Sequence, residues 1–241
     1  DFSSYINITD GRVVRALKLL ALSLRRRIYP LVDVFWAYSE NTKKLICSRG
    51  IDDKYIVTGL QGYPDELIDI NIESIDIERK SNSNYLLYLG YISERKGLDI
   101  LLPAMSRIYE QYGVKLKIAG VEEDTNDKNI NIDLPYVERL GYLEGKKKFS
   151  VIADSIALIL PSYGDPWGWV VQEAQSCFTP VITTKSVMAK ESLPSDSFVF
   201  KTGSVEECFY ALEKIIKLGK DEYKSSCISA REASRKHNLD K

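Results

Sequence analysis

Two carboxylates that stand close together in the stretch PSYGDPWGWVVQEA, residues 161–174, are the first candidates for chemistry. Asp165 precedes a helix that we expect over 167–178, with Pro166 suited to its first turn. Glu173 then falls about five residues inside this helix, roughly 7–8 Å along its axis at ~1.5 Å per residue. The two acids therefore flank the start of the helix, one outside it and one within it.

The helix start between these acids favours an anion, because the amides from Trp167 to Val170 have no partner within the helix. Gly168 lacks a side chain, which lets a ligand approach the backbone. A nucleotide sugar matches this layout. Asp165 would accept hydrogen bonds from sugar hydroxyls, the amides would hold the diphosphate, and Glu173 would hold the ribose diol.

Simpler interpretations of the same residues remain open. Asp165 can be a helix cap and Glu173 a solvated side chain, since both roles are common. A glycosidase pair would need a scissile bond between two carboxyls in an open cleft, and a helix start aimed between them suits phosphate better. Trp167 and Trp169 could stack on a sugar or base, but at most one of them faces a ligand because residues two apart do not share a helix face.

A second anion site is expected in GYISERKGLDI, residues 90–100, between Gly90 and Gly97. Lys96 lies at the start of the next expected helix, whose free amides and positive end point back toward this loop. Lys96 would neutralise a diphosphate as it leaves. The alternative is that Arg95 and Lys96 only solvate a helix start. Neither a G-x-G-x-x-G nor a G-x-x-x-x-G-K-[ST] motif occurs, which disfavours a dinucleotide-dependent dehydrogenase and a P-loop enzyme.

The composition describes an ordinary globular protein of 241 residues with 44% hydrophobic content. Its 33 basic and 34 acidic side chains give a formal net charge of −1, so we expect no nucleic-acid partner. The four cysteines lie far apart without a C-x-x-C pair, and no clustered histidines complete a zinc site. A reduced cytoplasmic compartment is the simplest interpretation. No apolar run reaches the ~18 residues of a membrane span.

Apolar strands that alternate with amphipathic helices predict an α/β fold, a mostly parallel sheet with helices on both faces. In such sheets ligands bind beyond the carboxyl ends of the strands, where both loops described above lie. A short helix with Ser39 as its N-cap is expected to end at Gly50. The expected strands cover 31–39, 54–59, 84–91, 114–120, 135–142, 155–160, 180–184 and 197–200, and the other helices cover 11–29, 97–112, 145–154, 167–178, 204–218 and 221–237.

Several of these segments together resemble the donor-binding half of family 4 glycosyltransferases of the GT-B fold. The segments are YLGYISERKGLDILLPAM, LKIAG, VERLGYL and ILPSYGDPWGWVVQEAQSCFTPVITT, and they occur in order over about 85–241. The resemblance implies two Rossmann-like domains that face each other across a cleft. It implies transfer from a nucleotide diphosphate donor, with retention at the anomeric carbon and without a bound metal or other cofactor. The absence of a D-x-D triplet agrees with this expectation.

The resemblance assigns Asp165 to the transferred sugar, Glu173 to the ribose and Lys96 to the diphosphate, with Asp165 and Lys96 as the catalytic residues. It places the backbone near Gly141 and Tyr142 beside the base. The remaining expected donor-binding residues are Gly90, Tyr91, Arg95, Trp167, Gly168, Trp169 and Val170. Two departures stand out, because the family usually has arginine where Tyr91 lies and glutamate where Asp165 lies. Arg95 is the candidate substitute for the missing arginine, and the shorter Asp165 predicts a different sugar or sugar pose.

The domain assignment follows from the polar stretch after residue 61, which we expect to be an exposed connection. Residues 1–61 are then the end of the acceptor-side domain, 62–84 the interdomain connection, and 85–241 the donor-binding domain. Only 30 residues precede the strand that begins at 31, and His237 is expected to be solvated. We therefore expect this chain to bind donor but to transfer sugar poorly without another domain or partner chain.

Three further alternatives stay open at this point. The chain could be a non-catalytic nucleotide-sugar-binding subunit, or a GT-B epimerase or phosphorylase, although no residues can be assigned to the last two. Arg25, Arg26 and Arg27 follow an apolar stretch and could form a basic amphipathic helix at the membrane face, useful for a lipid-linked acceptor. The other interpretation is a core-facing helix whose arginines complement its C-terminal dipole.

Overall fold

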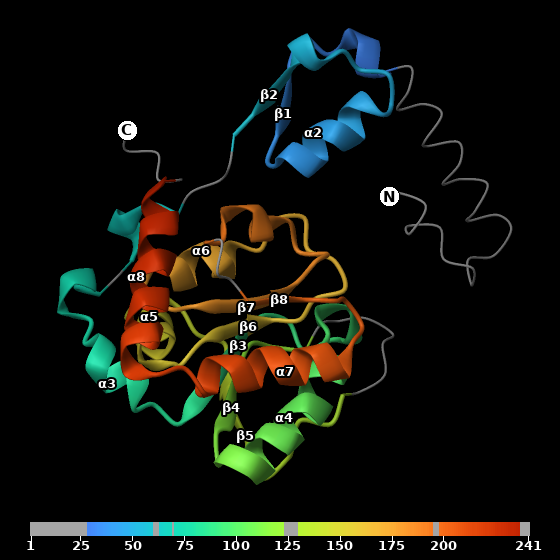
Figure 1. Ribbon diagram of the computed structural model, residues 1–241. Helices are drawn as coiled ribbons and strands as arrows, with labels where there is room; N and C mark the ends of the chain where they lie inside the picture. The colour runs from blue at the N-terminus through green and yellow to red at the C-terminus, as the bar shows by residue number, and fades with distance from the viewer. Residues whose placement is uncertain (1–27, 60–62, 69, 123–129, 195–197, 237–241) are drawn as a thin grey trace, which may run out of the picture. The chain divides into compact units, whose positions relative to one another are not determined.

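The computed structural model describes residues 28–59, 63–68, 70–122, 130–194 and 198–236 (Figure 1). The chain divides into two units, Asp1–Leu60 and Gln61–Lys241, which are described separately. Residues 11–27 of the helix expected over 11–29, which include its three arginines, and His237 lie outside the described residues. In the described part of the chain, no helix is both long and apolar enough to cross a membrane.

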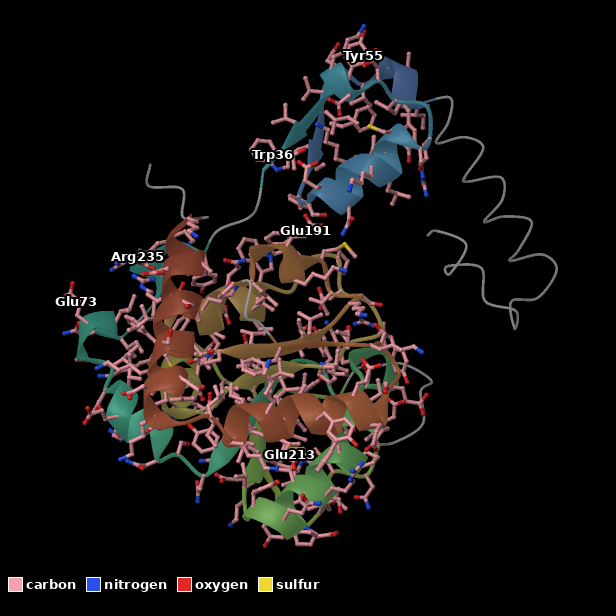
Figure 2. All side chains as sticks on the ribbon, in the orientation of Figure 1. Trp36, Tyr55, Glu73, Glu191, Glu213 and Arg235 are labelled. Atoms are coloured by element: carbon pink, nitrogen blue, oxygen red, sulfur yellow. The ribbon has the colours of Figure 1, made fainter. Side chains whose placement is uncertain are left out.

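The first unit contains a pair of parallel strands, β1 (Phe35–Ala37) and β2 (Ile56–Thr58). Helix α2 (Glu40–Cys47) follows β1, and two short 3-10 helices, Tyr29–Leu31 and Asp53–Tyr55, complete the described part. The predicted cap is confirmed, because the Thr42 amide donates to Ser39 Oγ at 3.0 Å. The strand expected over 31–39 is shorter than predicted. Trp36, labelled in Figure 2, remains exposed within β1.

The second unit is built on a six-stranded parallel sheet with the order β5-β4-β3-β6-β7-β8. The strands are β3 (Tyr85–Leu89), β4 (Lys115–Ala119), β5 (Val137–Gly141), β6 (Leu158–Leu160), β7 (Val181–Thr184) and β8 (Phe198–Phe200). The central strands are apolar on both faces, and Leu86, Leu87 and Tyr88 of β3 are fully buried. From β3 the chain builds the sheet outward to β5, then returns to the other side of β3 with β6. The loops that follow β3 and β6 therefore meet at the point where the strand order reverses, the usual ligand position in such sheets.

Helices cover both faces of this sheet, as the sequence predicted. Helix α4 (Leu98–Tyr112) packs against α7 (Val205–Ile216), while α6 (Trp169–Ser176) packs against α8 (Lys220–Lys236). Figure 1 shows α6 and α7 on opposite sides of the strands. Helix α5 (Gly145–Asp154) contacts α6 and the short helix α3 (Ile77–Ser81). The main correction concerns α6, which begins at Trp169 rather than at 167.

The segment after residue 62, predicted to be an exposed connection, contains regular structure and two buried side chains. It contains two 3-10 helices, Asp65–Leu67 and Ile72–Ser74, followed by α3, and it belongs to the second unit. Asp65 forms an ion pair with Arg231 of α8, and Ile68 is buried. The segment is therefore part of the packed unit, and its proposed role as a connection between domains remains a prediction.

Lys80 is the clearest sign of this packing, because its side chain is fully buried. Its ammonium donates to the Ala153 carbonyl at 2.8 Å and to Thr179 Oγ1 at 2.6 Å. Burial lowers the pKa of Lys80 to about 8. The long methylene stem lets a residue from the polar run ERKSNSN reach the end of α5, which the composition of that run does not reveal.

Candidate functional site

The loops after β3 and β6 are joined directly by backbone and side-chain hydrogen bonds. The Arg95 carbonyl accepts from the Tyr163 amide at 3.0 Å and from Ser162 Oγ at 3.2 Å. Gly97 ends the first loop with φ +79°, and a Cβ added there would lie 2.1 Å from the Pro161 carbonyl oxygen. Glycine is therefore required for this approach, which brings Lys96 beside the second loop.

Lys96 and Asp165 form an ion pair in the space between these loops. Lys96 Nζ lies 2.6 Å from Asp165 Oδ2, and the two side chains are 13% and 12% exposed. Asp165 Oδ1 also accepts from the Trp167 amide at 3.2 Å. Asp165 thus binds a loop amide two residues before α6 begins, and its second oxygen pairs with the lysine predicted to hold a diphosphate.

The start of α6 differs from the prediction in two respects. Gly168, rather than Pro166, immediately precedes the helix, in a left-handed conformation with φ +91°. The amide of Trp167, predicted to be free for a ligand, donates instead to Asp165. The indole of Trp167 is buried, whereas Trp169 is 45% exposed, so Trp169 is the member of the pair that can meet a ligand through its ring. Val170 is partly buried in the first turn.

Glu173 lies one turn further along α6, where it forms a second lysine–carboxylate pair. Lys148 Nζ of α5 lies 2.8 Å from Glu173 Oε1, and the side chains of Lys148 and Glu173 are 17% and 8% exposed. Tyr63 packs beside this pair, with its ring centroid 6.1 Å from that of Trp169 and 6.0 Å from that of Phe149. Burial and then the charge of Glu173 raise the pKa of Tyr63. Glu173 is therefore a partnered, buried acid rather than the solvated side chain of the simplest interpretation.

Sequence reasoning missed Lys148 and Tyr63. Lys148 belongs to the charged run GKKKF, and no spacing in that run distinguishes it from Lys146 and Lys147. Tyr63 lies in the segment predicted to be an exposed connection. Both residues reach Glu173 only because α5 and the segment after residue 62 pack against α6, and pairwise packing of this kind has no local sequence signal.

A hollow of about 230 Å³ lies at the carboxyl ends of β3, β4 and β5. Gly120 packs so tightly on Gly90 that a Cβ on Gly120 would lie 1.8 Å from the Gly90 carbonyl oxygen. Tyr91 and Tyr142 both line the hollow and are more than half exposed. The hollow is lined by Leu89, Gly90, Tyr91, Ala119, Gly120, Val121, Tyr142 and Leu143. Of the residues predicted for the donor, it brings together Gly90, Tyr91 and Tyr142, and Gly141 ends the adjoining strand β5.

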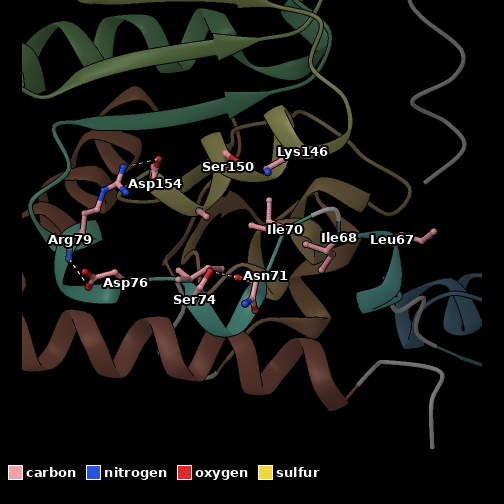
Figure 3. Close-up of a pocket in the computed structure, with 12 residues that line it drawn as sticks. Leu67, Ile68, Ile70, Asn71, Ser74, Asp76, Arg79, Lys146, Ser150 and Asp154 are labelled. Atoms are coloured by element: carbon pink, nitrogen blue, oxygen red, sulfur yellow. Dashed lines mark hydrogen bonds and ion pairs between the residues drawn. The ribbon is translucent and has the colours of Figure 1, made fainter.

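A larger groove of about 940 Å³ lies along α5 on the side of the segment 67–79 (Figure 3). Ile68, Ile70 and Ala153 line it together with Lys146 and the Arg79–Asp154 ion pair. None of the residues predicted for a donor lines this groove. Within the described ranges, no three His, Cys, Asp or Glu side chains come together as a metal site would require.

The arrangement at the reversal point offers a row of groups suited to one kind of ligand. A carboxylate paired with a lysine stands at each end, and the first turn of α6 lies between them. Carboxylates accept hydrogen bonds from hydroxyls, while the helix start and Lys96 attract an anion. The site therefore suits an anionic group that carries hydroxyl-rich parts on both sides.

Comparison with known proteins shows the family of this chain. The sequence model of the family described as glycosyl transferases group 1 matches residues 69–236. An uncharacterised glycosyltransferase of Methanocaldococcus jannaschii is 27% identical over 190 residues, which are 73% of this chain and 46% of that protein. A glycogen synthase of Mycobacterium tuberculosis is 26% identical over 67% of this chain and 41% of its own length. The chain thus spans about half the length of the curated relatives it matches.

Solved structures share the fold at low sequence identity. The Anabaena protein HepE, in complex with UDP and glucose, aligns with a TM-score of 0.67 and 17% identity over 86% of this chain and 59% of its own. Sucrose-phosphate synthase from Thermosynechococcus elongatus aligns with a TM-score of 0.73 and 16% identity over 98% of this chain and 61% of its own. These neighbours have the GT-B fold, which confirms the predicted fold class. By its sequence over 69–236, the chain belongs to the glycosyl transferases group 1 family.

Proposed function

We propose that the second unit is the donor site of a retaining, metal-independent glycosyltransferase of family 4, which takes a sugar from a nucleotide diphosphate. The observation that carries this proposal is the pair of lysine–carboxylate contacts, Lys96–Asp165 and Lys148–Glu173, on either side of the first turn of α6. Each contact offers a cation and a hydrogen-bond acceptor of the kind that a nucleotide sugar requires. Family membership and the described geometry support it together.

Lys96 and the start of α6 would hold the diphosphate. As the bond between the anomeric carbon and the diphosphate oxygen breaks, negative charge grows on the leaving group. A cation and a helix start that are already in place stabilise that charge without reorganising. Asp165 would accept hydrogen bonds from the transferred sugar, and its low exposure keeps this carboxylate in one position beside Lys96.

The nucleoside would extend from the diphosphate toward α5 and β5. Glu173 would accept hydrogen bonds from the ribose hydroxyls, and the base would enter the hollow between Tyr91 and Tyr142. HepE of Anabaena, which shares the fold, was solved with UDP and with UDP-glucose. This supports a nucleotide as the ligand class, with uracil as the first base to test.

The acceptor and the place of action belong to the same proposal. The acceptor hydroxyl would come from a glycan or a lipid-linked sugar at the cytoplasmic membrane face, presented by another domain or a partner chain. Polysaccharide assembly is the proposed process.

A second candidate is a nucleotide-sugar-binding subunit without its own transfer activity. The exposed Tyr91 favours it, because an arginine is usual at this position in the family that the sequence resembles. Without that arginine, Lys96 would neutralise the diphosphate without the second cation that is usual in the family.

Calorimetric titration with UDP, GDP and ADP and with their sugar conjugates tests the proposal. We expect one base to bind clearly more tightly than the others, and its sugar conjugate to bind at least as well as the free diphosphate. Failure of every nucleotide to bind would refute both candidates. Release of free sugar or transfer to an added acceptor would then separate the enzyme from the binding subunit.

A further inference from the structure

We propose that Lys148 and Tyr63 are positioning residues that hold the Glu173 carboxylate in the orientation needed to accept both ribose hydroxyls. This inference rests on the proposed function, since it concerns how the same donor site selects a ribonucleotide. Neither residue would touch the reacting atoms. Their effect would pass through Glu173.

Glu173 needs partners because its side chain is only 8% exposed. A buried carboxylate needs a counter-charge or hydrogen bonds to compensate for the hydration that it loses. Lys148 supplies that counter-charge at 2.8 Å from Oε1, from the neighbouring helix α5. A carboxylate accepts about four hydrogen bonds, so a single lysine contact leaves room for two hydroxyls.

The lysine is itself held in place by aromatic rings. Lys148 Nζ lies 4.7 Å from the centroid of the Phe149 ring and 5.9 Å from that of Tyr63. The Tyr63 ring also meets Phe149 and Trp169 edge-on. Cation–ring contacts are directional, so these rings limit the positions of the ammonium and favour the one that contacts Glu173.

Tyr63 also lies near Glu173, since the negative charge of Glu173 helps to raise the pKa of the Tyr63 hydroxyl. The segment that carries Tyr63 is anchored two residues later by the ion pair between Asp65 and the buried Arg231 of α8. It is anchored again at Lys80, which binds the end of α5. Tyr63 therefore approaches Glu173 from a segment that is fixed to two of the surrounding helices, and three elements converge on one carboxylate.

A merely structural ion pair would stabilise the fold but would not affect the affinity for the ribose hydroxyls. A positioning pair makes a different prediction: loss of Lys148 or Tyr63 should weaken ligands that carry ribose hydroxyls and spare ligands that lack them. The comparison of a nucleoside diphosphate with its 2′,3′-dideoxy form isolates this effect, since the base and the diphosphate are unchanged.

The test is calorimetric titration of both forms, using the base that the wild-type chain binds best. We expect the wild type to prefer the ribonucleotide at least tenfold. Lys148→Met and Tyr63→Leu should each reduce this preference at least threefold while changing dideoxynucleotide affinity less than twofold, and Lys148→Arg should restore most of the preference. Lys146→Met, an exposed lysine of the same helix, serves as the matched control and should leave the preference unchanged.

Equal losses for both nucleotides, or an unchanged preference in both variants, would overturn the positioning role and leave the proposed donor site intact. If the wild type bound no nucleoside diphosphate, the donor site itself would be refuted and this inference with it. Should Lys148→Met fail to fold, Tyr63→Leu decides, because it removes the ring beside Lys148 and leaves both charges of the Lys148–Glu173 pair in place.

Discussion

Lys96 Nζ lies 2.6 Å from Asp165 Oδ2, although 69 positions separate the two residues in the chain. The contact follows from topology, because β3 and β6 are adjacent parallel strands and both loops leave the same edge of the sheet. Both side chains are largely removed from water, so this pair is held more firmly than a surface ion pair. In the proposed donor complex, the diphosphate and the transferred sugar meet at this contact.

Replacement of Lys96 by methionine should weaken binding of the nucleoside diphosphate by roughly 10- to 100-fold, because a charge-assisted contact is lost at about 1.5–3 kcal/mol. Affinity for the uncharged nucleoside should change little. Titration of both ligands checks the prediction, with Lys224→Met, an exposed lysine of α8, as the matched control. Equal weakening of nucleoside and diphosphate would contradict the assignment of Lys96.

Replacing each acid by its amide should weaken the binding of different ligands. Glu173→Gln should weaken the free nucleoside diphosphate and its sugar conjugate alike, at least fivefold, because ribose is common to both. Asp165→Asn should weaken the sugar conjugate more than the free diphosphate, because it acts at the sugar end. Dissociation constants of both variants for both ligands test the two roles. The opposite pattern would show that the roles of Asp165 and Glu173 are exchanged.

Gly97→Ala should destabilise the protein by at least ~2 kcal/mol, since the added Cβ would lie 2.1 Å from the Pro161 carbonyl oxygen at a residue with φ +79°. Gly113→Ala is the matched control. Gly113 has φ +69° at the end of α4 but has nothing within 4 Å of the added Cβ, so its substitution should cost only about 1 kcal/mol. Urea unfolding measures both. Similar losses for the two variants would show that the close approach of the β3 and β6 loops does not require glycine at position 97.

Lys80 should make stability depend on pH in an unusual direction. Burial lowers its pKa in the folded chain from 10.5 to about 8, so between these values the unfolded chain holds the extra proton. Stability should therefore rise with pH across this window, by on the order of 1 kcal/mol from about pH 7 to about pH 9. The difference between wild type and Lys80→Met isolates the effect from other titrating groups. If the free energy of unfolding of the wild type does not rise relative to that of Lys80→Met as the pH increases, the lowered pKa of Lys80 is ruled out.

The sheet and most of its helices could be predicted because their apolar residues repeat with the periods of strands and helices. The candidate site residues Lys96 and Asp165 could be placed together because the loops after parallel strands share one edge, and Glu173 could be placed near them because it lies in the helix that follows Asp165. Periodicity and strand order can be recognised in a single sequence without knowledge of which side chains touch.

The errors fall where contact between elements decides the outcome. Lys80 and Tyr63 lie in a polar stretch that resembles an exposed linker, yet both pack against helices far along the chain. The start of α6 at Trp169 depends on the left-handed Gly168, which sits against Leu160 and Val187. No local sequence pattern predicts these contacts. Lys148 is distinguished from Lys146 and Lys147 by its contact with Glu173 of α6.

The most direct measurement is a crystal structure of the chain with its tightest-binding nucleotide sugar. The account predicts diphosphate oxygens within hydrogen-bond distance of Lys96 Nζ and the first turn of α6, ribose hydroxyls on Glu173, and sugar hydroxyls on Asp165. A nucleotide bound elsewhere, such as in the groove along α5, or bound in reverse with ribose at Asp165, would contradict it.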